Sequence, residues 1–309
     1  MEKLRIPWGQ NKLAIRVILN GKKAGLEPVR QAIFAAREQG EVEVRVTWEG
    51  GDAARLVKEA ANEGCQRLVA GGGDGSVNEI VNALMQLPAS ERPELAVLPL
   101  GTANDFATAC GIPAEPLKAL VLAQSDDATL VDCAKANDNY FMNVASGGFG
   151  AQVTTNTPVA LKNFLGGGAY TLSGLVQALN FTPFPGEVKL PDEVISRKVI
   201  VGAVCNGRQA GGGQQLAPGA LIDDGLLDIV GLSHFPAEAI SDVIAELIGE
   251  DSQGTYVTRS RVPWVEWSSE KIMPINLDGE PIAEYKVRFE AVPGAIKLVV
   301  PATCPMLST

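Results

Sequence analysis

The stretch Gly71-Gly72-Gly73-Asp74-Gly75-Ser76 joins a short apolar run, Arg67–Ala70, to the amphipathic run Val77–Leu87. This order predicts a strand that ends in a glycine turn and is followed at once by a helix. Glycines let the backbone wrap closely around an anion, and a helix start offers free N–H groups at the positive end of its dipole. The alternative is a tight turn before a well-capped helix, with Ser76 and Glu79 forming a capping box. The loop lacks the lysine of a Walker loop, so by itself it indicates only anion binding.

A second glycine turn of the same kind follows the next apolar run, Leu95–Leu98. It reads Pro99-Leu100-Gly101-Thr102-Ala103-Asn104-Asp105, and a helix is expected to begin near Asn104. Asn104 or Asp105 could simply cap that helix, which is the better interpretation of this turn taken alone. Two polar glycine turns at neighbouring strand ends together favour a nucleotide-binding cleft more strongly than either turn does alone.

The first part of the chain alternates apolar runs with runs of helical spacing. Expected strands are Leu13–Leu19, Val42–Thr47, Arg67–Ala70 and Leu95–Leu98, and expected helices are Leu26–Gln39, Asp52–Glu63 and Val77–Leu87. Gly64 is well placed to end the second helix. Strand–helix repetition of this kind predicts a parallel sheet covered on both faces, with ligands bound beyond the carboxyl ends of its strands.

Short strand-like runs dominate the chain after about residue 128 and predict an antiparallel sandwich or barrel-like domain. These runs are Thr129–Ala134, Tyr140–Val144, Lys198–Cys205, Leu226–Gly231, Tyr256–Ser260, Val262–Trp267, Lys271–Leu277, Tyr285–Glu290 and Ala295–Val300. Helical insertions are expected at about 158–181 and 236–249. The predicted division is an α/β domain at 12–126 and a β-rich domain at 128–300. Whether residues 301–309 join the first domain is left open.

Composition excludes several classes of protein. The 309 residues carry a formal charge of −10, which disfavours nucleic-acid binding and strong adhesion to an anionic membrane. Five widely spaced cysteines do not form a disulfide or zinc pattern. There is no signal-peptide core and no apolar run of about 20 residues, so a cytoplasmic location is expected. His234 is the only histidine, which nearly excludes a mechanism that depends on histidine.

Several segments together are specific enough to indicate a family. Gly72–Ser76 with Asn78 and Glu79, then Pro99–Asp105, resembles the diacylglycerol kinase catalytic-domain family. The resemblance continues through Asn206–Gln215, Leu221–Leu226 and Leu277–Glu280 and is strongest to bacterial YegS-type lipid kinases. One departure is Ser76, where the family usually has threonine; both residues supply a hydroxyl. The resemblance implies an α/β nucleotide-binding domain of the NAD kinase and phosphofructokinase type, a β-rich second domain and a cleft between them.

The resemblance also implies which residues bind ATP. The glycine-loop positions are matched by Gly73, Asp74, Gly75, Ser76, Val77, Asn78 and Glu79. Thr102 matches a second nucleotide contact, and Thr47 matches a third at the end of the second strand. Without the resemblance, Thr47 would be interpreted as an ordinary strand end.

The turn Asp278-Gly279-Glu280 is the candidate catalytic site. An Asp-Gly pair between apolar strands predicts a hairpin far more often than a catalytic residue. The resemblance instead implies that Glu280 is the general base, while Asp278 helps to orient the substrate hydroxyl or a metal ion. A carboxylate can accept the proton of an attacking hydroxyl, and phosphoryl transfer otherwise depends on positioning and charge neutralisation.

The acidic turn after Leu221 is the candidate metal site. The simplest interpretation of Asp223-Asp224-Gly225 is a solvated turn. The resemblance implies that Asp224 and the backbone carbonyls of Leu221 and Leu226 hold a structural or regulatory Mg²⁺. One carboxylate with carbonyls and waters suits a hard cation, and Ca²⁺ could occupy the same oxygens.

The leading hypothesis is Mg²⁺-dependent transfer of the ATP γ-phosphate to a lipid hydroxyl, such as that of phosphatidylglycerol or diacylglycerol. One alternative is a kinase of a soluble acceptor such as NAD or a sugar phosphate, and another is a non-catalytic lipid or nucleotide sensor. A lipid acceptor implies transient contact with a membrane surface, for which Phe164–Leu179 and the basic residues around Trp8 are candidates. The oligomeric state is not predicted.

Overall fold

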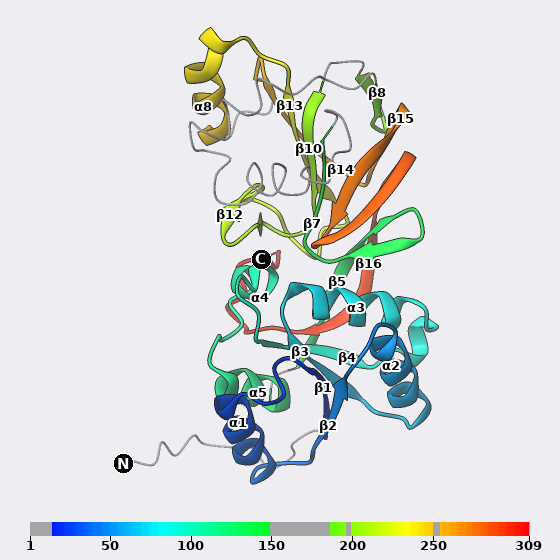
Figure 1. Ribbon diagram of the computed structural model, residues 1–309, viewed down its shortest axis with the longest axis vertical. Helices are drawn as coiled ribbons and strands as arrows, with labels where there is room; N and C mark the ends of the chain where they lie inside the picture. Colours follow the sequence, from blue (N-terminus) through cyan, green and yellow to red (C-terminus); the bar gives the residue numbers. More distant parts are fainter. Residues whose placement is uncertain (1–13, 126, 149–185, 196–198, 250–253, 309) are drawn as a thin grey trace. The chain divides into compact units, whose positions relative to one another are not determined.

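The structure is a computed structural model that describes residues 14–125, 127–148, 186–195, 199–249 and 254–308. The chain divides into two compact units (Figure 1). Unit 1 contains the residues up to Gly101 together with Cys110–Leu130 and Ile296–Cys304. Unit 2 contains Thr102–Ala109, Val131–Ala295 and the residues from Pro305. Strands β5 (Ala128–Ala136) and β16 (Glu280–Val299) contribute residues to both units.

Unit 1 is built on a parallel sheet. Its strands are β1 (Ile15–Asn20), β2 (Val42–Thr47), β3 (Arg67–Gly72) and β4 (Glu94–Pro99), in the order β2-β1-β3-β4. The last part of β16 adds a further parallel strand beside β4, where Leu298 pairs with Leu95. The expected parallel α/β sheet is therefore confirmed, and β2 has the predicted bounds.

Helices cover both faces of this sheet (Figure 1). Helix α1 (Glu27–Arg37) packs with α5 (Pro116–Ser125), and α2 (Asp52–Asn62) packs with α3 (Asp74–Met85). A 3₁₀ turn, η1 (Ala89–Glu91), precedes β4. Alternate residues of β1, among them Val17 and Leu19, pack with α1 and α5 in one buried cluster. Burying apolar residues on both faces is what a parallel sheet between helix layers requires.

Gly64 ends α2 as the sequence predicts. It has a φ of +71°, which a residue with a side chain rarely adopts. The Gly64 N–H donates to the Ala61 carbonyl at 3.0 Å, and the Cys65 N–H donates to the Ala60 carbonyl at 2.9 Å. These two bonds form a Schellman motif, which satisfies carbonyls at the helix end.

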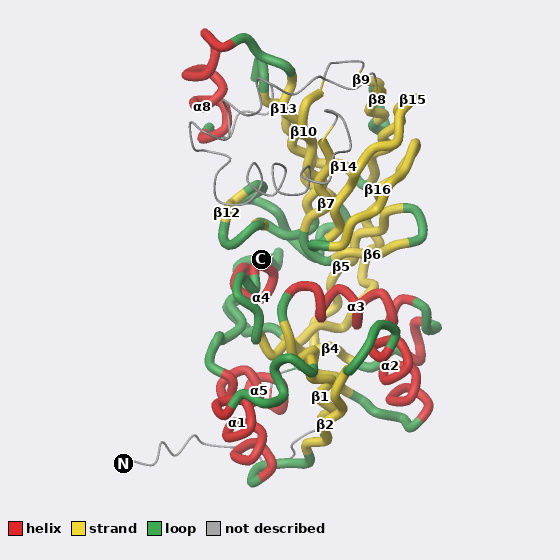
Figure 2. Tube along the Cα trace, viewed as in Figure 1, coloured by secondary structure: helices red, strands yellow, loops and turns green. Residues whose placement is uncertain are grey.

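Unit 2 consists mainly of antiparallel strands (Figure 2). The central order is β14-β13-β10-β7-β15-β16, and these strands are β7 (Val144–Gly148), β10 (Val199–Cys205), β13 (Leu227–Ser233), β14 (Val257–Val262), β15 (Trp264–Leu277) and β16. Shorter strands are β6 (Asn139–Phe141), β8 (Gly186–Lys189), β9 (Val194–Ile195), β11 (Gln209–Ala210) and β12 (Gln214–Gln215). Among the described residues of this unit, the helical elements are α4 (Asp105–Ala109), the 3₁₀ turn η2 (Ala237–Ala239) and α8 (Ile240–Ile248).

Two buried apolar clusters support the strands of unit 2. One is centred on Trp267, whose ring packs edge-on against Phe289 with ring centres 4.7 Å apart. Gly147 is needed beside Trp267, because a Cβ atom there would lie 2.8 Å from the indole ring. The second cluster contains Phe235 and Val243, so the helical segment around α8 is packed onto the strands.

The β-rich second half of the predicted fold is confirmed, with changes in individual elements. The run Tyr140–Val144 is not one strand, because bends at Met142 and Asn143 separate β6 from β7. The two runs within Val262–Leu277 form one long strand, β15. The predicted helix at about 236–249 is present as η2 and α8. The predicted insertion at 158–181 lies outside the described residues.

We expect Gly64→Ala to lower the free energy of unfolding by about 1 kcal/mol, because alanine must adopt the left-handed conformation at the end of α2. Urea denaturation would measure the change. Gly25→Ala is a matched control, since Gly25 lacks a positive φ and an added Cβ would meet nothing within 4 Å. Equal stability of the two variants would show that this helix end is not held in the observed conformation.

Candidate functional site

The glycine loop between β3 and α3 is packed too closely for side chains. A Cβ atom on Gly72 would lie 2.2 Å from Ser76 Oγ, and one on Gly73 would lie 3.0 Å from the Gly101 Cα atom. Gly73 occupies the cap position and Asp74 begins the helix, so Ser76 lies inside the first turn. The capping box predicted for Ser76 and Glu79 is therefore wrong: glycine at the cap has no side chain to offer.

The two glycine turns lie side by side, as the sequence predicts. Strands β3 and β4 are parallel neighbours, and Gly72 pairs with Pro99 at their carboxyl ends. The Leu100 N–H donates to the Gly72 carbonyl at 2.7 Å, which joins the turns directly. Gly73 and Gly101 can approach this closely because neither has a side chain.

A polar contact connects the glycine loop to the end of the neighbouring strand β1. The Asn20 side-chain amide donates to Ser76 Oγ at 3.1 Å. Asn20 ends β1 and pairs in register with Thr47, which ends β2. Thr47, Asn20 and the glycine loop therefore occupy successive strand ends along one edge of the sheet of unit 1. This edge is where open α/β sheets bind ligands.

The residues predicted to contact a nucleotide differ in accessibility. Glu79 and Thr102 are exposed, and Gly73 to Ser76 are half-buried, as is Thr47. Val77 and Asn78 are buried, at 3% and 5% exposure. The Asn78 side-chain oxygen also accepts a hydrogen bond from Asn82 at 3.1 Å. The Val77 N–H donates to the Gly73 carbonyl at 3.1 Å, so this N–H is used within the helix and is not offered to a ligand at the helix start.

The Asp278–Glu280 segment is a tight hairpin between β15 and β16. Asp278 and Gly279 have φ values of +50° and +105°, and Leu277 pairs with Glu280 across the turn. Two consecutive positive φ values are typical of the two-residue turns that match strand twist. The hairpin interpretation of this Asp-Gly pair is thus correct, and it does not compete with a chemical role for the flanking carboxylates.

The Asp278 carboxylate accepts hydrogen bonds from three consecutive backbone N–H groups. The donors are the backbone N–H groups of Met142, Asn143 and Val144, at 2.7, 3.1 and 2.8 Å from the carboxylate oxygens. The Asp278 N–H in turn donates to the Val144 carbonyl at 3.1 Å. These bonds replace strand pairing at Met142 and Asn143, which explains the break between β6 and β7. The side chain therefore fixes the turn to the neighbouring backbone.

Glu280 has a different environment from Asp278. It is exposed, and within the described part of the chain its carboxylate makes no hydrogen bond or ion pair. It is held only by the backbone pairing that follows the turn. A carboxylate on a fixed backbone with no protein donor of its own can accept a proton from a bound substrate.

Asp105 forms a contact that sequence reasoning missed. Its carboxylate accepts the Gly212 N–H at 2.9 Å and the Gly213 N–H at 2.7 Å. Asp105 is only 5% exposed, and Gly211, Gly212 and Gly213 all have positive φ values. The three glycines thus allow a loop that wraps around a buried carboxylate. The cluster of glycines was visible in the sequence, but the partner 107 residues away was not.

A chain of buried amides connects Asp105 to the acidic hairpin within unit 2. Gln209 Nε2 donates to the Asp105 carbonyl at 3.1 Å, and the Gln209 carbonyl accepts Asn143 Nδ2 at 2.6 Å. The Asn143 N–H then donates to Asp278. Asn143 and Gln209 are 4% and 5% exposed. These hydrogen bonds hold the two buried amides in one arrangement, while Asn143 Oδ1 has no hydrogen-bond partner among the described residues.

The predicted metal-binding turn is present, with Asp224 half-buried. Asp224 Oδ1 accepts the Leu226 N–H at 3.0 Å, and Oδ2 lies 3.8 Å from the Arg261 guanidinium. Gly225 has a φ of +72°, and its N–H donates to the buried carboxylate of Asp132 at 2.6 Å. Among the described residues, no three His, Cys, Asp or Glu side chains converge as metal ligands. A cation at this turn would thus depend on one carboxylate and backbone carbonyls, as the resemblance implies.

Negative charge accumulates around this turn. Burial raises the pKa of Asp132 against the effect of the Gly294 and Gly225 N–H groups, and Asp224 and Asp223 raise it further. Burial likewise raises the pKa of Asp228, which Arg261 lowers and Asp224 raises. Arg261 offsets only part of the charge of these carboxylates, so a nearby cation is favoured. The donor set and its charge therefore fit Mg²⁺ or Ca²⁺.

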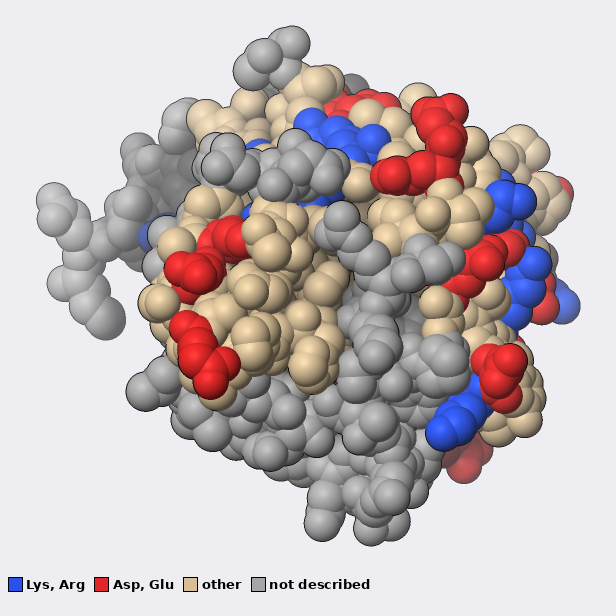
Figure 3. Space-filling view, turned by 90° about the horizontal axis from the view of Figure 1, so that it is seen from above, with Lys and Arg blue, Asp and Glu red and all other residues tan. Residues whose placement is uncertain are grey.

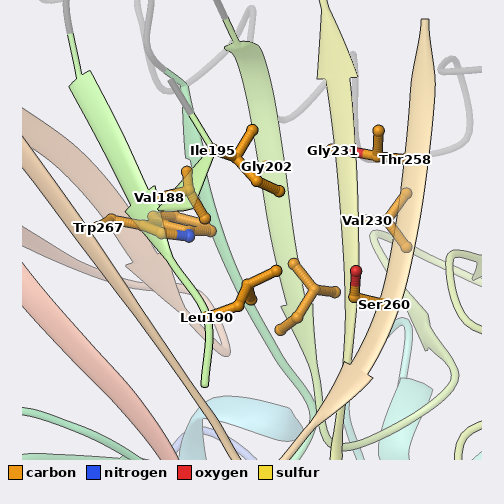
Figure 4. A pocket seen from close by; sticks show the side chains of 10 residues that line it. Val188, Leu190, Ile195, Gly202, Val230, Gly231, Thr258, Ser260 and Trp267 are labelled. Atoms are coloured by element: carbon orange, nitrogen blue, oxygen red, sulfur yellow. The ribbon is translucent and has the colours of Figure 1, made fainter. Parts of the chain in front are cut away.

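Unit 2 also contains a small apolar pocket (Figure 4). Trp267 and Val188 form one wall, and Val230, Thr258 and Ser260 face them from the opposite strands. Leu190, Ile195 and Ile229 add apolar surface. The pocket encloses only about 30 Å³, which is room for about one water molecule, so it is a gap in the core packing and not a ligand site.

The remaining surface features agree with the composition. On the face shown in Figure 3, acidic and basic side chains of the described residues are interspersed, and no broad basic area is visible among them. All five cysteines are free thiols. Within the described residues, no helix has the length and apolar character to span a membrane.

Comparisons with known proteins give the class to which this fold and these loops belong. Residues 14–136 match the model of the diacylglycerol kinase catalytic domain, and residues 143–300 match the YegS C-terminal NAD kinase beta sandwich-like domain. A diacylglycerol kinase crystal structure from Bacillus anthracis str. Sterne shares the fold at 23% identity, with a TM-score of 0.74. That match covers 96% of this chain and 100% of the other. The class is thus the diacylglycerol-kinase-like enzymes.

Two curated relatives identify the family within this class. Both are named "Probable lipid kinase YegS-like": the one from Shewanella frigidimarina is 50% identical over 295 residues, and the one from Chromohalobacter salexigens is 49% identical over 294. The first match covers 95% of this chain and 96% of the relative, and the second covers 94% of each. The chain belongs to the YegS-like family of lipid kinases.

We expect Asp278→Asn to lower the free energy of unfolding by about 3 kcal/mol, because an amide NH₂ would replace an oxygen that faces backbone donors. Glu280→Gln should change it by less than about 0.5 kcal/mol, since Glu280 is exposed. Chemical denaturation of both variants would measure the difference. Equal losses of stability would contradict the different environments of the two carboxylates.

Proposed function

We propose that this lipid kinase transfers the γ-phosphate of ATP to a hydroxyl of a lipid such as phosphatidylglycerol or diacylglycerol, with Glu280 as the general base. The observation that carries the proposal is the contrast within the acidic hairpin. Asp278 is fully engaged by Met142, Asn143 and Val144, whereas Glu280 is exposed beside it. One carboxylate thereby holds the turn and the other is available to react.

The reaction assigns a task to each of these groups. As the lipid hydroxyl oxygen attacks the γ-phosphorus, Glu280 accepts the hydroxyl proton. The bond from the γ-phosphorus to the β–γ bridging oxygen breaks, and ADP leaves. Asp278 keeps the turn in place and so positions Glu280. General-base assistance of this kind contributes about 10²–10⁴-fold to a rate.

The nucleotide-binding role is proposed for the predicted domain 12–126, and the catalytic and acceptor-binding roles for the domain 128–300. At the first, Gly73, Gly75 and the start of α3 offer backbone N–H groups to phosphate oxygens, with Ser76 as a hydroxyl donor. The paired turns at Gly73 and Gly101 support this role, because their close approach leaves backbone rather than side chains at the edge of the sheet. Thr47 and Thr102 are proposed as further contacts to ATP.

A lipid acceptor is supported by the two curated relatives, both of which are named as probable lipid kinases. Membrane contact must then be transient, and the formal charge of −10 disfavours electrostatic adhesion to anionic lipid.

Asp224 and the carbonyls of Leu221 and Leu226 are the residues that would hold Mg²⁺. When bound, the ion would neutralise the excess carboxylate charge of this turn and act as a structural or regulatory cation. Asp132 supports the same turn by accepting the Gly225 and Gly294 N–H groups, at 2.6 and 2.9 Å. Arg261 balances part of the charge through Asp228 and Asp224.

We expect Glu280→Gln to reduce phosphate transfer from radioactive ATP to lipid vesicles by about 100-fold or more, because glutamine cannot accept a proton. ATP affinity and the free energy of unfolding should remain close to wild type. Vesicles with phosphatidylglycerol, vesicles with diacylglycerol, and NAD in solution would be compared as acceptors. Glu284 lies farther along the same strand and is half-buried, so Glu284→Gln is a control for the loss of a carboxylate from this strand, with normal transfer expected.

Each possible outcome of this assay has a defined meaning. Undiminished transfer by Glu280→Gln would exclude Glu280 as the base. Labelling of NAD but not of either vesicle would replace the lipid acceptor by a soluble one. ATP binding without transfer to any acceptor would favour a sensor.

We expect about 10 mM Mg²⁺ to raise the free energy of unfolding of the wild type by roughly 1 kcal/mol or more, because a ligand that binds only the folded state stabilises it. Asp224→Asn should lose most of this effect. Asp223→Asn is the control, since the Asp223 carboxylate accepts the Ser308 N–H and hydroxyl instead. Denaturation with Mg²⁺, with Ca²⁺ and with neither would distinguish the ions. A full Mg²⁺ response in Asp224→Asn would remove this residue from the site.

A further inference from the structure

Trp48 is the most exposed large apolar side chain among the described residues, with 90% of its surface accessible. The next, Phe34, is 58% exposed. Most of the contact area of an indole is apolar, so a side chain left this open contributes little to stability by burial. Folding therefore does not explain why a tryptophan stands here.

The backbone around Trp48 is fixed although its side chain is not. Asp52 Oδ2 accepts the Trp48 N–H at 2.7 Å and the Glu49 N–H at 3.1 Å. Asp52 Oδ1 accepts Arg55 Nη2 at 2.7 Å. The Trp48 and Glu49 N–H groups and the Arg55 guanidinium lower the pKa of Asp52 to about 2, so it stays ionised near neutral pH. The start of α2 thus holds the loop that carries the indole.

The position of Trp48 on the sheet relates it to the glycine loop. Trp48 directly follows Thr47, which pairs with Asn20 at the end of β1. Asn20 in turn contacts Ser76 in the glycine loop. Only β1 separates β2 from β3, and neighbouring strands lie about 4.8 Å apart, so the ends of β2 and β3 are roughly 10 Å apart.

The separation between the ends of β2 and β3 is comparable to the distance between the phosphates and the base of a nucleotide. On the β4 side, Gly101 closes tightly against Gly73, which leaves no room there for a flat ring. A nucleotide with its phosphates at the start of α3 can extend across the end of β1 toward β2. Its base then meets the only large aromatic side chain at the described strand ends of this edge. Base–aromatic stacking needs just an open ring face, which Trp48 has.

We propose that Trp48 binds the adenine base of ATP by stacking and thereby contributes to nucleotide affinity. This inference rests on the proposed ATP site and adds a binding residue to it. It assigns Trp48 to the base and leaves the phosphates to the glycine loop. The side chain has no part in the transfer step itself.

The test compares a nucleotide with a ligand that has the phosphates but no base. ATP and inorganic tripolyphosphate would be titrated calorimetrically into the full chain, its Trp48→Ala variant and its Trp48→Phe variant. Trp48→Ala should weaken ATP binding about tenfold and leave tripolyphosphate binding unchanged, because stacking contributes only when a base is present. Trp48→Phe should restore most of the ATP affinity. Phe34→Ala, which removes another exposed aromatic ring of unit 1 from the outside of α1, should bind both ligands normally.

Four results would overturn the proposal. Unchanged ATP affinity in Trp48→Ala, with tight binding by the wild type, would remove Trp48 and leave the kinase function intact. Equal losses of ATP and tripolyphosphate affinity would show a general disturbance of the edge. Normal ATP binding with loss of sedimentation with phosphatidylglycerol vesicles would make Trp48 a membrane contact instead. Failure of the wild type to bind ATP at all would refute the proposed nucleotide site as well.

Discussion

The acidic hairpin depends on one carboxylate that binds three successive backbone N–H groups. Asp278 draws Met142 and Asn143 out of strand pairing and ties them, together with Val144 at the start of β7, to the turn between β15 and β16. A charged acceptor makes these bonds stronger than neutral ones, and it leaves no donor at the turn unsatisfied. The neighbouring Glu280 therefore projects from a defined backbone. In the proposed mechanism, the structural and chemical tasks are divided between two acidic residues that are separated only by Gly279.

Unit 1 is likewise organised by close contacts at its turns, because glycines bring two turns together. Gly72, Gly73 and Gly101 let backbone approach backbone at the strand ends, and Asn20 links the result to Ser76. In unit 2, buried amides make the link between turns: Gln209 and Asn143 connect Asp105 to Asp278 through hydrogen bonds. In both units the polar contacts lie at strand ends or turns, while the apolar clusters pack between the layers.

Much of this organisation follows from local sequence patterns. Period-two and period-3.6 spacing predicted the sheet of unit 1, and Gly64 marked a helix end because only glycine readily takes its conformation. The adjacency of the two glycine turns followed from parallel strand order. The family resemblance supplied what spacing could not, namely a chemical meaning for Thr47 and for the Asp278 hairpin.

What the sequence could not predict are contacts between distant residues. The Asp105 carboxylate binds glycines more than 100 residues away, and Asp278 binds a segment about 135 residues away. Such pairs have no periodic signature, and each carboxylate also fits a simpler local role, as a helix cap or a turn residue. The prediction that Ser76 caps the helix is wrong because Gly73, the residue before Asp74, occupies the cap position without a side-chain hydrogen bond. The exposure of Trp48 likewise appears only once the fold is known.

Chemical rescue by formate tests the division of roles between Glu280 and Asp278 most directly. A small carboxylate can replace a missing base that is open to solvent, but it cannot rebuild an anchor that three N–H groups hold inside the fold. Formate should therefore restore transfer to lipid vesicles by about tenfold or more in Glu280→Ala and have no effect in Asp278→Ala. Rescue of Asp278→Ala instead, or a wild-type rate in Glu280→Ala without formate, would contradict the assignment.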